Sequence, residues 1–204
     1  MTNNNIISYY KWHRRMKFFL GALICDGLVT LTAGILYLFV QFLSQGNIPT
    51  APAGILSIIL FCICVLVFPA LIVSLIISTM KTKQENSLMP EEQERAAREN
   101  RSVFQKIKLI KAAGVPVPAS VIWLLILSLL SLLAALLGGL LLALGIGGIL
   151  MGYALLLGFA DGYFGGCVAL FHSGMLLFLL FPHLIIIFFQ LAHKYANTKL
   201  LTLG

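Results

Sequence analysis

The chain alternates long hydrophobic runs with short polar stretches, and this alternation is its strongest signal. Between residues 18 and 80 the sole charged side chain is Asp26, and between residues 112 and 193 it is Asp161. Ionisable side chains are costly in the hydrocarbon of a bilayer, whereas the loops outside it accept them. A helical span needs about 20 mostly apolar residues. The pattern therefore predicts an all-α fold, a polytopic bundle of transmembrane helices.

The first half of the chain holds two such runs, at about residues 18–43 and 54–79. The residues between them, 44–53, include two prolines but no charge. Because so short a connection returns the chain directly, residues 18–79 are predicted to form a transmembrane hairpin. Pro69 lies inside the second run, where its ring removes a helical hydrogen bond and predicts a kink.

The second half, residues 120–193, predicts a second transmembrane module. Runs at about residues 120–142 and 167–192 are each long enough to cross a bilayer. The intervening stretch, 145–165, is also largely apolar. It is expected either to remain embedded in the membrane as a re-entrant connection or to supply an additional span.

The number of spans depends on glycines at positions 145, 147 and 148, which could form a tight turn. Such a turn would create a fifth span over about residues 147–163. Four spans place the carboxy-terminal tail, 194–204, on the same side as the amino terminus, and that tail carries Lys194 and Lys199. Because basic residues favour the cytoplasmic side, we favour four spans plus an embedded connection over five.

The polar segments carry twelve of the fourteen basic residues, in 11–17 and 81–111. Residues 1–17 form a basic, aromatic tail that we expect to be cytoplasmic. Residues 80–119 predict a cytoplasmic loop whose helix begins at Ser87–Pro90 and ends at Gly114. Basic residues expected at the membrane surface are Arg14, Arg15, Lys17, Lys106, Lys108 and Lys111.

The basic half of the predicted loop helix carries an apolar stripe, formed by Val103, Phe104, Ile107 and Ile110. Such a helix can lie on the inner leaflet of the membrane, or it can be a solvated connector. The expected topology, with the amino terminus in the cytoplasm, applies equally to a bacterial inner membrane and to an organellar membrane.

Composition agrees with a membrane protein, because 60% of the residues are hydrophobic and 10% are charged. A soluble domain has about 25% charged residues. The formal charge of +7 is explained by basic residues retained on the cytoplasmic side, so no nucleic-acid partner is expected. The expected partners are the lipid bilayer and either a second copy of the chain or another membrane protein.

Small residues recur at helical spacing in three of the runs and predict close helix packing or a face for self-association. The positions are Gly27 and Gly34 in the first run, Ser128, Ser131 and Gly139 in the third, and Gly166 and Ser173 in the last.

A few polar side chains fall where the bilayer should be, and an intramembrane ionisable residue is a functional hypothesis. Asp26 shares a helix face with Thr30 and Tyr37, and His172 and His183 lie nearly on one face of the last run. These five residues could line a pathway for protons or ions. Alternatively, each polar group is satisfied locally and only fixes packing.

No catalytic, nucleotide-binding or metal-binding motif occurs in the chain, so no catalytic residue, cofactor or metal site is expected. The four cysteines lie in or beside apolar runs and are interpreted as small apolar residues. The favoured function is an interaction or accessory component that packs with membrane partners or with itself. The alternative is a small transporter or channel for an ion or small solute, and a membrane-embedded enzyme comes third.

Overall fold

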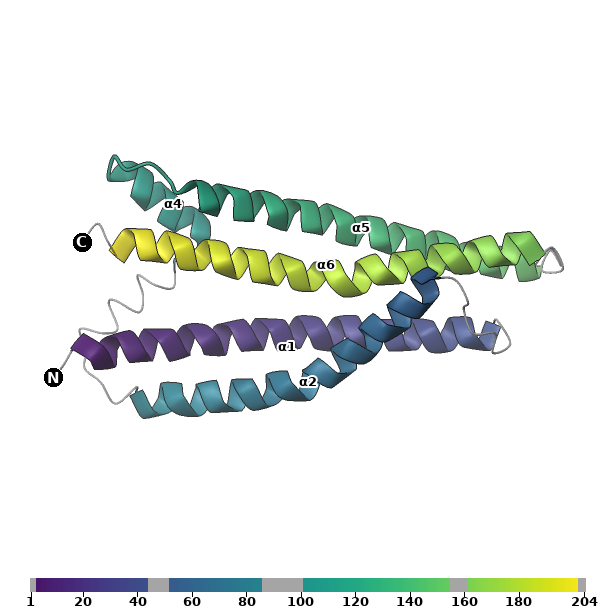
Figure 1. The fold of residues 1–204 in the computed structure, drawn as a ribbon, viewed down its shortest axis with the longest axis horizontal. Helices are drawn as coiled ribbons and strands as arrows, with labels where there is room; N and C mark the ends of the chain where they lie inside the picture. The colour runs from purple at the N-terminus through teal and green to yellow at the C-terminus, as the bar shows by residue number, and fades with distance from the viewer. Residues whose placement is uncertain (1–2, 44–51, 86–100, 155–160, 202–204) are drawn as a thin grey trace. The chain divides into compact units, whose positions relative to one another are not determined.

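A computed structural model describes residues 3–43, 52–85, 101–154 and 161–201 of the chain. These residues form five helices and no strand (Figure 1). The helices are α1 (Asn3–Leu43), α2 (Pro52–Glu85), α4 (Val103–Ala112), α5 (Ala119–Ala154) and α6 (Asp161–Leu201). The all-α fold class is confirmed.

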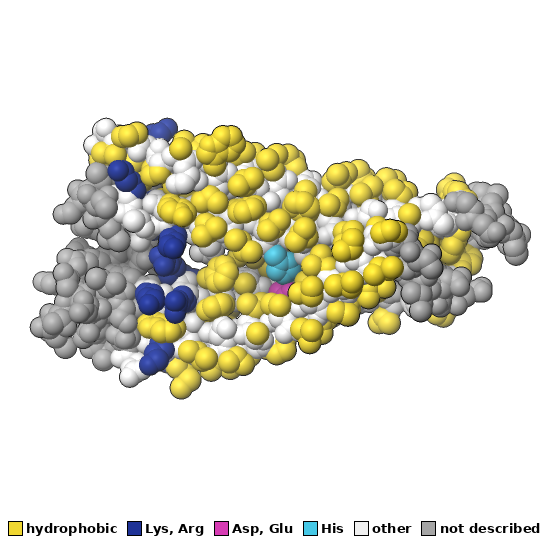
Figure 2. Space-filling model, in the orientation of Figure 1, with side chains coloured by type: hydrophobic (Ala, Val, Ile, Leu, Met, Phe, Trp, Pro, Cys, Tyr) yellow, Lys and Arg dark blue, Asp and Glu magenta, His cyan; other side chains and the backbone are white. Residues whose placement is uncertain are grey.

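Four of the helices are long and apolar enough to cross a membrane: Lys11–Leu43, Pro52–Gln84, Ala119–Ala154 and Tyr163–Leu200. Many of their leucine and isoleucine side chains are exposed, as lipid-facing side chains would be. Figure 2 shows hydrophobic side chains covering most of the helical surface on the face drawn. The four apolar helices indicate an integral membrane protein.

The glycine turn of the five-span alternative, at residues 145–148, does not form, because α5 continues as one helix to Ala154. Residues 147–154 thus belong to α5, and α6 begins at Asp161, so the described residues contain no fifth span. Residues 155–160, in the predicted connection, lie outside the described residues. Gly145 is needed for helix packing rather than for a turn, because a Cβ at this position would lie 2.6 Å from the backbone nitrogen of Phe171 on α6.

Contacts divide the chain into two compact units, and each long helix contributes a segment to both. The first unit consists of Met1–Leu23, Ala70–Leu129 and Ile185–Gly204, and the second of Ile24–Pro69 and Leu130–Leu184. Pro69 and Pro182 both lie inside continuous helices.

The first unit contains α4 and the basic side chains of the described residues. Its core joins Val103 and Ile110 of α4 with Val121 of α5 and Ala192 and Ala196 of α6. The apolar face of α4 is therefore covered mainly by protein, whereas Phe104 remains exposed. Neither alternative for this helix, a position on the inner leaflet or a solvated connector, placed the stripe against α5 and α6.

Lys106 differs from the other basic residues expected at the membrane surface, because its side chain is not exposed. Its side chain is fully buried, and its ammonium donates a hydrogen bond to Asn197 Oδ1 at 2.8 Å. A buried ammonium needs hydrogen-bond acceptors, and α6 supplies one from the face that α4 packs against. Lys106 thus ties α4 to α6.

The helix that ends before Gly114 begins at Val103, so the loop is not one unbroken helix from the predicted start. Residues 86–100, which include the predicted start at Ser87–Pro90, lie outside the described residues. A new helix begins at Val103, where Ser102 and Gln105 form a capping box with bonds of 3.0 and 3.2 Å. The predicted stop at Gly114 is confirmed, since this glycine has a positive φ of 69° just beyond the helix end.

The second unit has a core of aliphatic, aromatic and cysteine side chains from α1, α2, α5 and α6. Its tightest packing joins α5 to α6. A Cβ at Gly138 would lie 2.8 Å from Leu177 Cβ, and one at Gly174 would lie 2.6 Å from the Leu142 nitrogen. Backbones approach this closely only where side chains are absent. This unit also contains Asp26, His172 and His183.

Candidate functional site

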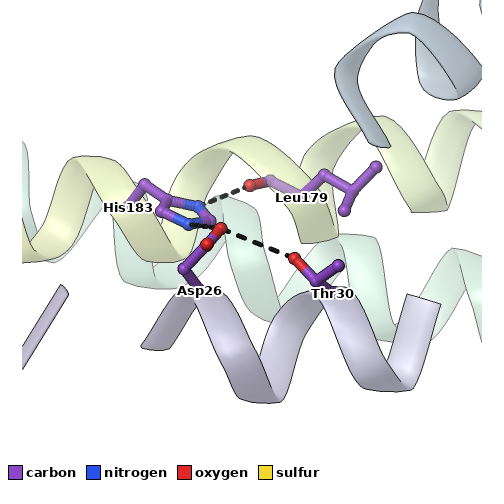
Figure 3. Close-up of polar contacts among 4 residues, drawn as sticks. All are labelled: Asp26, Thr30, Leu179 and His183. Carbon is purple, nitrogen blue, oxygen red and sulfur yellow. Dashed lines mark hydrogen bonds and ion pairs between the residues drawn. The ribbon is translucent and has the colours of Figure 1, made fainter. Parts of the chain in front are cut away.

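Asp26 is the centre of the candidate site. It lies in the part of α1 that belongs to the second unit, and its side chain is only 1% exposed. Its Oδ1 lies 3.1 Å from Nε2 of His183, on α6 (Figure 3). Figure 3 shows the imidazole of His183 directed at the Asp26 carboxylate. The structure thus brings together two of the five residues predicted for a pathway.

The second ring nitrogen of His183 orients the imidazole toward Asp26. Nδ1 lies 2.8 Å from the carbonyl oxygen of Leu179, one turn back on α6. A carbonyl can only accept, so Nδ1 carries a proton and donates it. A neutral His183 then presents a lone pair at Nε2, and Asp26 must donate to it. A protonated His183 instead faces a carboxylate. Either way, one proton lies between Nε2 and Oδ1.

The remaining contacts of Asp26 are sparse for a buried carboxyl group. Thr30, one turn along α1, donates to Oδ1 over 3.5 Å, which is at the long limit of a hydrogen bond. Oδ2 is buried and has no hydrogen-bond partner among the described residues. A buried, unsatisfied oxygen is costly in an apolar setting. The site therefore retains the capacity to bind a proton, a water molecule or a cation.

Cys64 of α2 completes the surroundings of the carboxyl group. Its side chain is buried, and its sulfur lies within 4.8 Å of the ligand atoms of both Asp26 and His183. No feature of the sequence predicted this contact, because the three residues lie on three different helices. From the sequence alone, helical spacing can predict which polar residues share a face of one helix, but it cannot predict contacts between different helices.

His172 and Tyr37 belong to a separate cluster in the same unit. Nδ1 of His172 lies 3.0 Å from the hydroxyl of Ser57. That hydroxyl donates to the Gly54 carbonyl at 2.8 Å, so His172 Nδ1 donates to Ser57. The ring of Tyr37 lies 5.9 Å from the His172 ring. The five predicted pathway residues therefore form two groups: Asp26, Thr30 and His183 in one, and Tyr37 and His172 in the other.

Some of the predicted packing residues contact a neighbouring helix, and others have no neighbour close to them. Gly27 and Gly34 face aromatic rings of α2: a Cβ at Gly27 would lie 3.1 Å from Phe68, and one at Gly34 would lie 3.5 Å from Phe61. Gly139 and Gly166 have nothing within 4 Å of the Cβ position. The remaining three are Ser131, which is buried, and Ser128 and Ser173, which are half-buried.

The sequence missed the glycines that form the α5–α6 contact, Gly138, Gly145 and Gly174. The predicted packing face of this helix included Gly139, whereas the contact is made by the adjacent Gly138. In a helix one position is a rotation of about 100°, so adjacent glycines face different neighbours.

The predicted surface cations remain accessible except for Lys106. Arg15, Lys17, Lys108 and Lys111 are exposed, and Arg14 is half-buried. Arg15 stacks over the Trp12 ring at 4.8 Å. Arg14 and Lys17 also line a cavity of about 190 Å³ in the first unit together with Arg101 and His193.

Comparison of this chain with protein-family models, with curated proteins and with solved structures finds no match. Function is therefore argued from the site itself. Asp26 and His183 form a buried acid–base pair in an apolar bundle, with one carboxylate oxygen unpaired and one imidazole partly exposed, at 26%. Such a pair has the chemical groups to hold a proton or a cation.

Proposed function

We propose that this membrane protein is a small transporter or channel that binds a cation at the Asp26–His183 pair. The observation that carries the proposal is the 3.1 Å contact between Asp26 Oδ1 and His183 Nε2 inside an apolar unit. Ionisable residues in membrane spans are rare because they are costly, and they mark ion pathways where they occur. Where Asp26 of α1 meets His183 of α6, a carboxylate and an imidazole are both available to one bound cation.

Two details favour cation binding over a purely structural hydrogen bond. A bond that only holds helices together would satisfy both carboxylate oxygens, yet Asp26 Oδ2 has no partner among the described residues. His183 is 26% exposed, so its imidazole is not sealed inside the second unit. A partly exposed ring and an unused carboxylate oxygen are features that an exchangeable site would need.

The test is cation flux in proteoliposomes. Wild-type protein should dissipate an imposed proton or metal-ion gradient, and Asp26→Asn should lose most of that flux because it lacks the anionic group. Cys62→Ser is the control: Cys62 is exposed on α2 and takes no part in the Asp26 cluster, so this change should leave the flux intact. Equal flux in wild type and Asp26→Asn would refute the proposal, as would a wild-type protein that moves no cation.

A second function is proposed on a different observation. Gly139 and Gly166 are exposed and have nothing within 4 Å of the Cβ position, so each leaves a smooth helix surface open. Small residues on an open face let another helix approach closely. As an interaction component, the protein would associate through these faces with a second copy of itself. Gly166→Leu should then convert a detergent-solubilised oligomer to a monomer; a wild-type monomer would contradict it.

The orientation is proposed together with the function. Every basic residue in the described part of the chain belongs to the first unit, which holds the helix ends nearest the chain termini. The positive-inside tendency assigns this unit to the cytoplasmic side, with the amino terminus inside. Four spans place the carboxy terminus on the same side. Reporter fusions at both termini should give cytoplasmic signals, and opposite signals would contradict a four-span topology.

A further inference from the structure

Three side chains with metal-ligating chemistry meet in the second unit: the carboxylate of Asp26, the thiol of Cys64 and the imidazole of His183. Their ligand atoms all lie within 4.8 Å of one another. They come from α1, α2 and α6, so they converge only in the folded bundle. Oxygen, sulfur and nitrogen donors of these kinds are the ligands that Zn²⁺ takes in proteins.

The spacing of these atoms is close to that of a tetrahedral site. Metal bonds of about 2.0 Å place neighbouring nitrogen and oxygen ligands of a tetrahedron about 3.3 Å apart. The observed separation of His183 Nε2 and Asp26 Oδ1 is 3.1 Å. A thiolate bound at about 2.3 Å would lie about 3.5 Å from the other two ligand atoms. The Cys64 sulfur already lies within 4.8 Å of both, which is near that separation.

The outer contacts are also those of a metal ligand. A metal-bound histidine donates its second N–H to a carbonyl or carboxylate, which orients the ring. His183 Nδ1 makes this bond to Leu179, at 2.8 Å, and so directs the lone pair of Nε2 at the site. Asp26 Oδ2 is buried without a partner among the described residues, so it can accept the ion or a water molecule bound to it.

Charge favours a divalent ion at this depth. Binding of the ion would release two protons to solvent, the one shared by His183 Nε2 and Asp26 Oδ1 and the thiol proton of Cys64. Asp26 and Cys64 would then supply two negative charges and His183 none. A divalent cation bound there makes a neutral site, which removes most of the cost of a charge in an apolar interior. Ca²⁺ and Mg²⁺ prefer six or more oxygen ligands, and this mixed donor set does not provide them.

We propose that Asp26, Cys64 and His183 bind a divalent transition-metal ion of the Zn²⁺ class, and that this ion is the transported cation. Three protein ligands leave the fourth tetrahedral position open, as suits an ion that must be exchanged rather than held. The assignment of the ion as cargo rests on the proposed transport function, whereas the binding site does not depend on it.

Cobalt binding tests the site directly. Full-length protein in detergent is titrated with CoCl₂, because Co²⁺ replaces Zn²⁺ and absorbs light where Zn²⁺ does not. We expect a saturable thiolate-to-Co²⁺ charge-transfer band that ZnCl₂ abolishes by competition. Cys64→Ser should remove the band. Cys62→Ser should keep it, because Cys62 is exposed on the same helix and takes no part in the cluster.

The other two ligands are tested by affinity. Loss of an outer-shell partner weakens metal binding about 10–100-fold, and loss of a ligand should cost at least as much. Asp26→Asn and His183→Gln should therefore weaken Co²⁺ binding by about 10-fold or more. A wild-type protein without the charge-transfer band, or a band unchanged in Cys64→Ser, would overturn the proposal.

A measurement on unmodified protein avoids any folding defect of the variants. Wild-type protein is treated with a small membrane-permeant thiol reagent, with and without ZnCl₂, and the cysteine peptides are quantified by mass spectrometry. Zn²⁺ should slow modification of Cys64 several-fold while leaving Cys62, the internal reference, unchanged. Equal rates at Cys64 with and without Zn²⁺ would count against the site.

The two proposals fail in different ways. Metal binding in detergent without flux in liposomes would overturn the transport function and the cargo assignment but leave the metal site standing. Asp26-dependent flux of protons, in a protein that binds neither Co²⁺ nor Zn²⁺, would overturn the metal site and leave the transport function standing.

Discussion

Asp26 and His183, separated by 157 positions in the sequence, lie 3.1 Å apart between Oδ1 and Nε2. The contact ties α1 to α6 within the second unit, and the Leu179 carbonyl fixes the histidine from behind. It is the one place among the described residues where a carboxyl group meets an imidazole. Both the stability of the bundle and its proposed cation site depend on this pair, and substitutions can separate the two roles.

Asp26→Asn should fold almost as well as wild type. The amide can donate to Nε2 of His183, so the free energy of unfolding should change by less than about 1 kcal/mol. Asp26→Leu removes the partner of a half-buried imidazole and should cost about 1–3 kcal/mol. Thermal unfolding in detergent, followed by helical circular dichroism, distinguishes the two. Equal losses in both variants would show that the negative charge itself stabilises the fold.

Gly145→Ala and Gly139→Ala form a matched pair on α5. A Cβ at Gly145 would lie 2.6 Å from the backbone nitrogen of Phe171, so α5 and α6 must move apart, at a cost of about 1–3 kcal/mol. Gly139 has nothing within 4 Å, and alanine there should raise stability by up to about 1 kcal/mol through helix propensity. The same unfolding assay applies, and two similar shifts would contradict the glycine contact between α5 and α6.

The bond between Lys106 and Asn197 should show strong coupling in a double-mutant cycle. Asn197→Leu removes an acceptor from a fully buried ammonium, whereas Lys106→Met removes the charge at similar volume. The double variant should therefore be more stable than the two single losses predict, by about 0.5–3 kcal/mol. Additive effects would mean that the ammonium reaches water instead.

Ser102→Ala should loosen the start of α4. The serine hydroxyl accepts from the Gln105 backbone N–H at 3.2 Å, and the Gln105 side chain accepts from the Ser102 N–H at 3.0 Å. Loss of an N-cap costs about 1 kcal/mol. Amide hydrogen exchange should quicken in the first turn of α4 and stay unchanged in α5. Unchanged exchange in α4 would indicate that packing of Val103 and Ile110, rather than the cap, holds this helix.

Much of the fold could be predicted from the sequence because the bilayer imposes a simple rule. Charged residues are excluded from spans. Residues 18–80 and 112–193 contain only Asp26 and Asp161 as charged residues, and each stretch is long enough for two spans, which gives the four apolar helices of the structure. The helix limits were less predictable. α1 begins at Asn3 and α6 continues to Leu201, well beyond the apolar runs, because polar residues can extend a helix past the membrane.

The site was predicted in its residues but not in its arrangement. An acid and a histidine in apolar runs are conspicuous, so Asp26, Thr30 and His183 were identified individually. Their pairing, and the separate grouping of His172 with Ser57, depend on how helices rotate against each other. That rotation is set by contacts such as Gly138 and Gly174, where an error of one position changes the face. Cys64 gave no signal, since a cysteine in an apolar run resembles any other small core residue.

The most direct test of the central claim is the initial rate of cation uptake by proteoliposomes that contain equal amounts of wild type, Asp26→Asn or Asp26→Glu. If the carboxylate beside His183 binds the cation, Asp26→Asn should fall to the rate of empty liposomes, and Asp26→Glu, which keeps the negative charge, should recover part of the wild-type rate. An Asp26→Asn protein that takes up the cation as fast as wild type would contradict the claim.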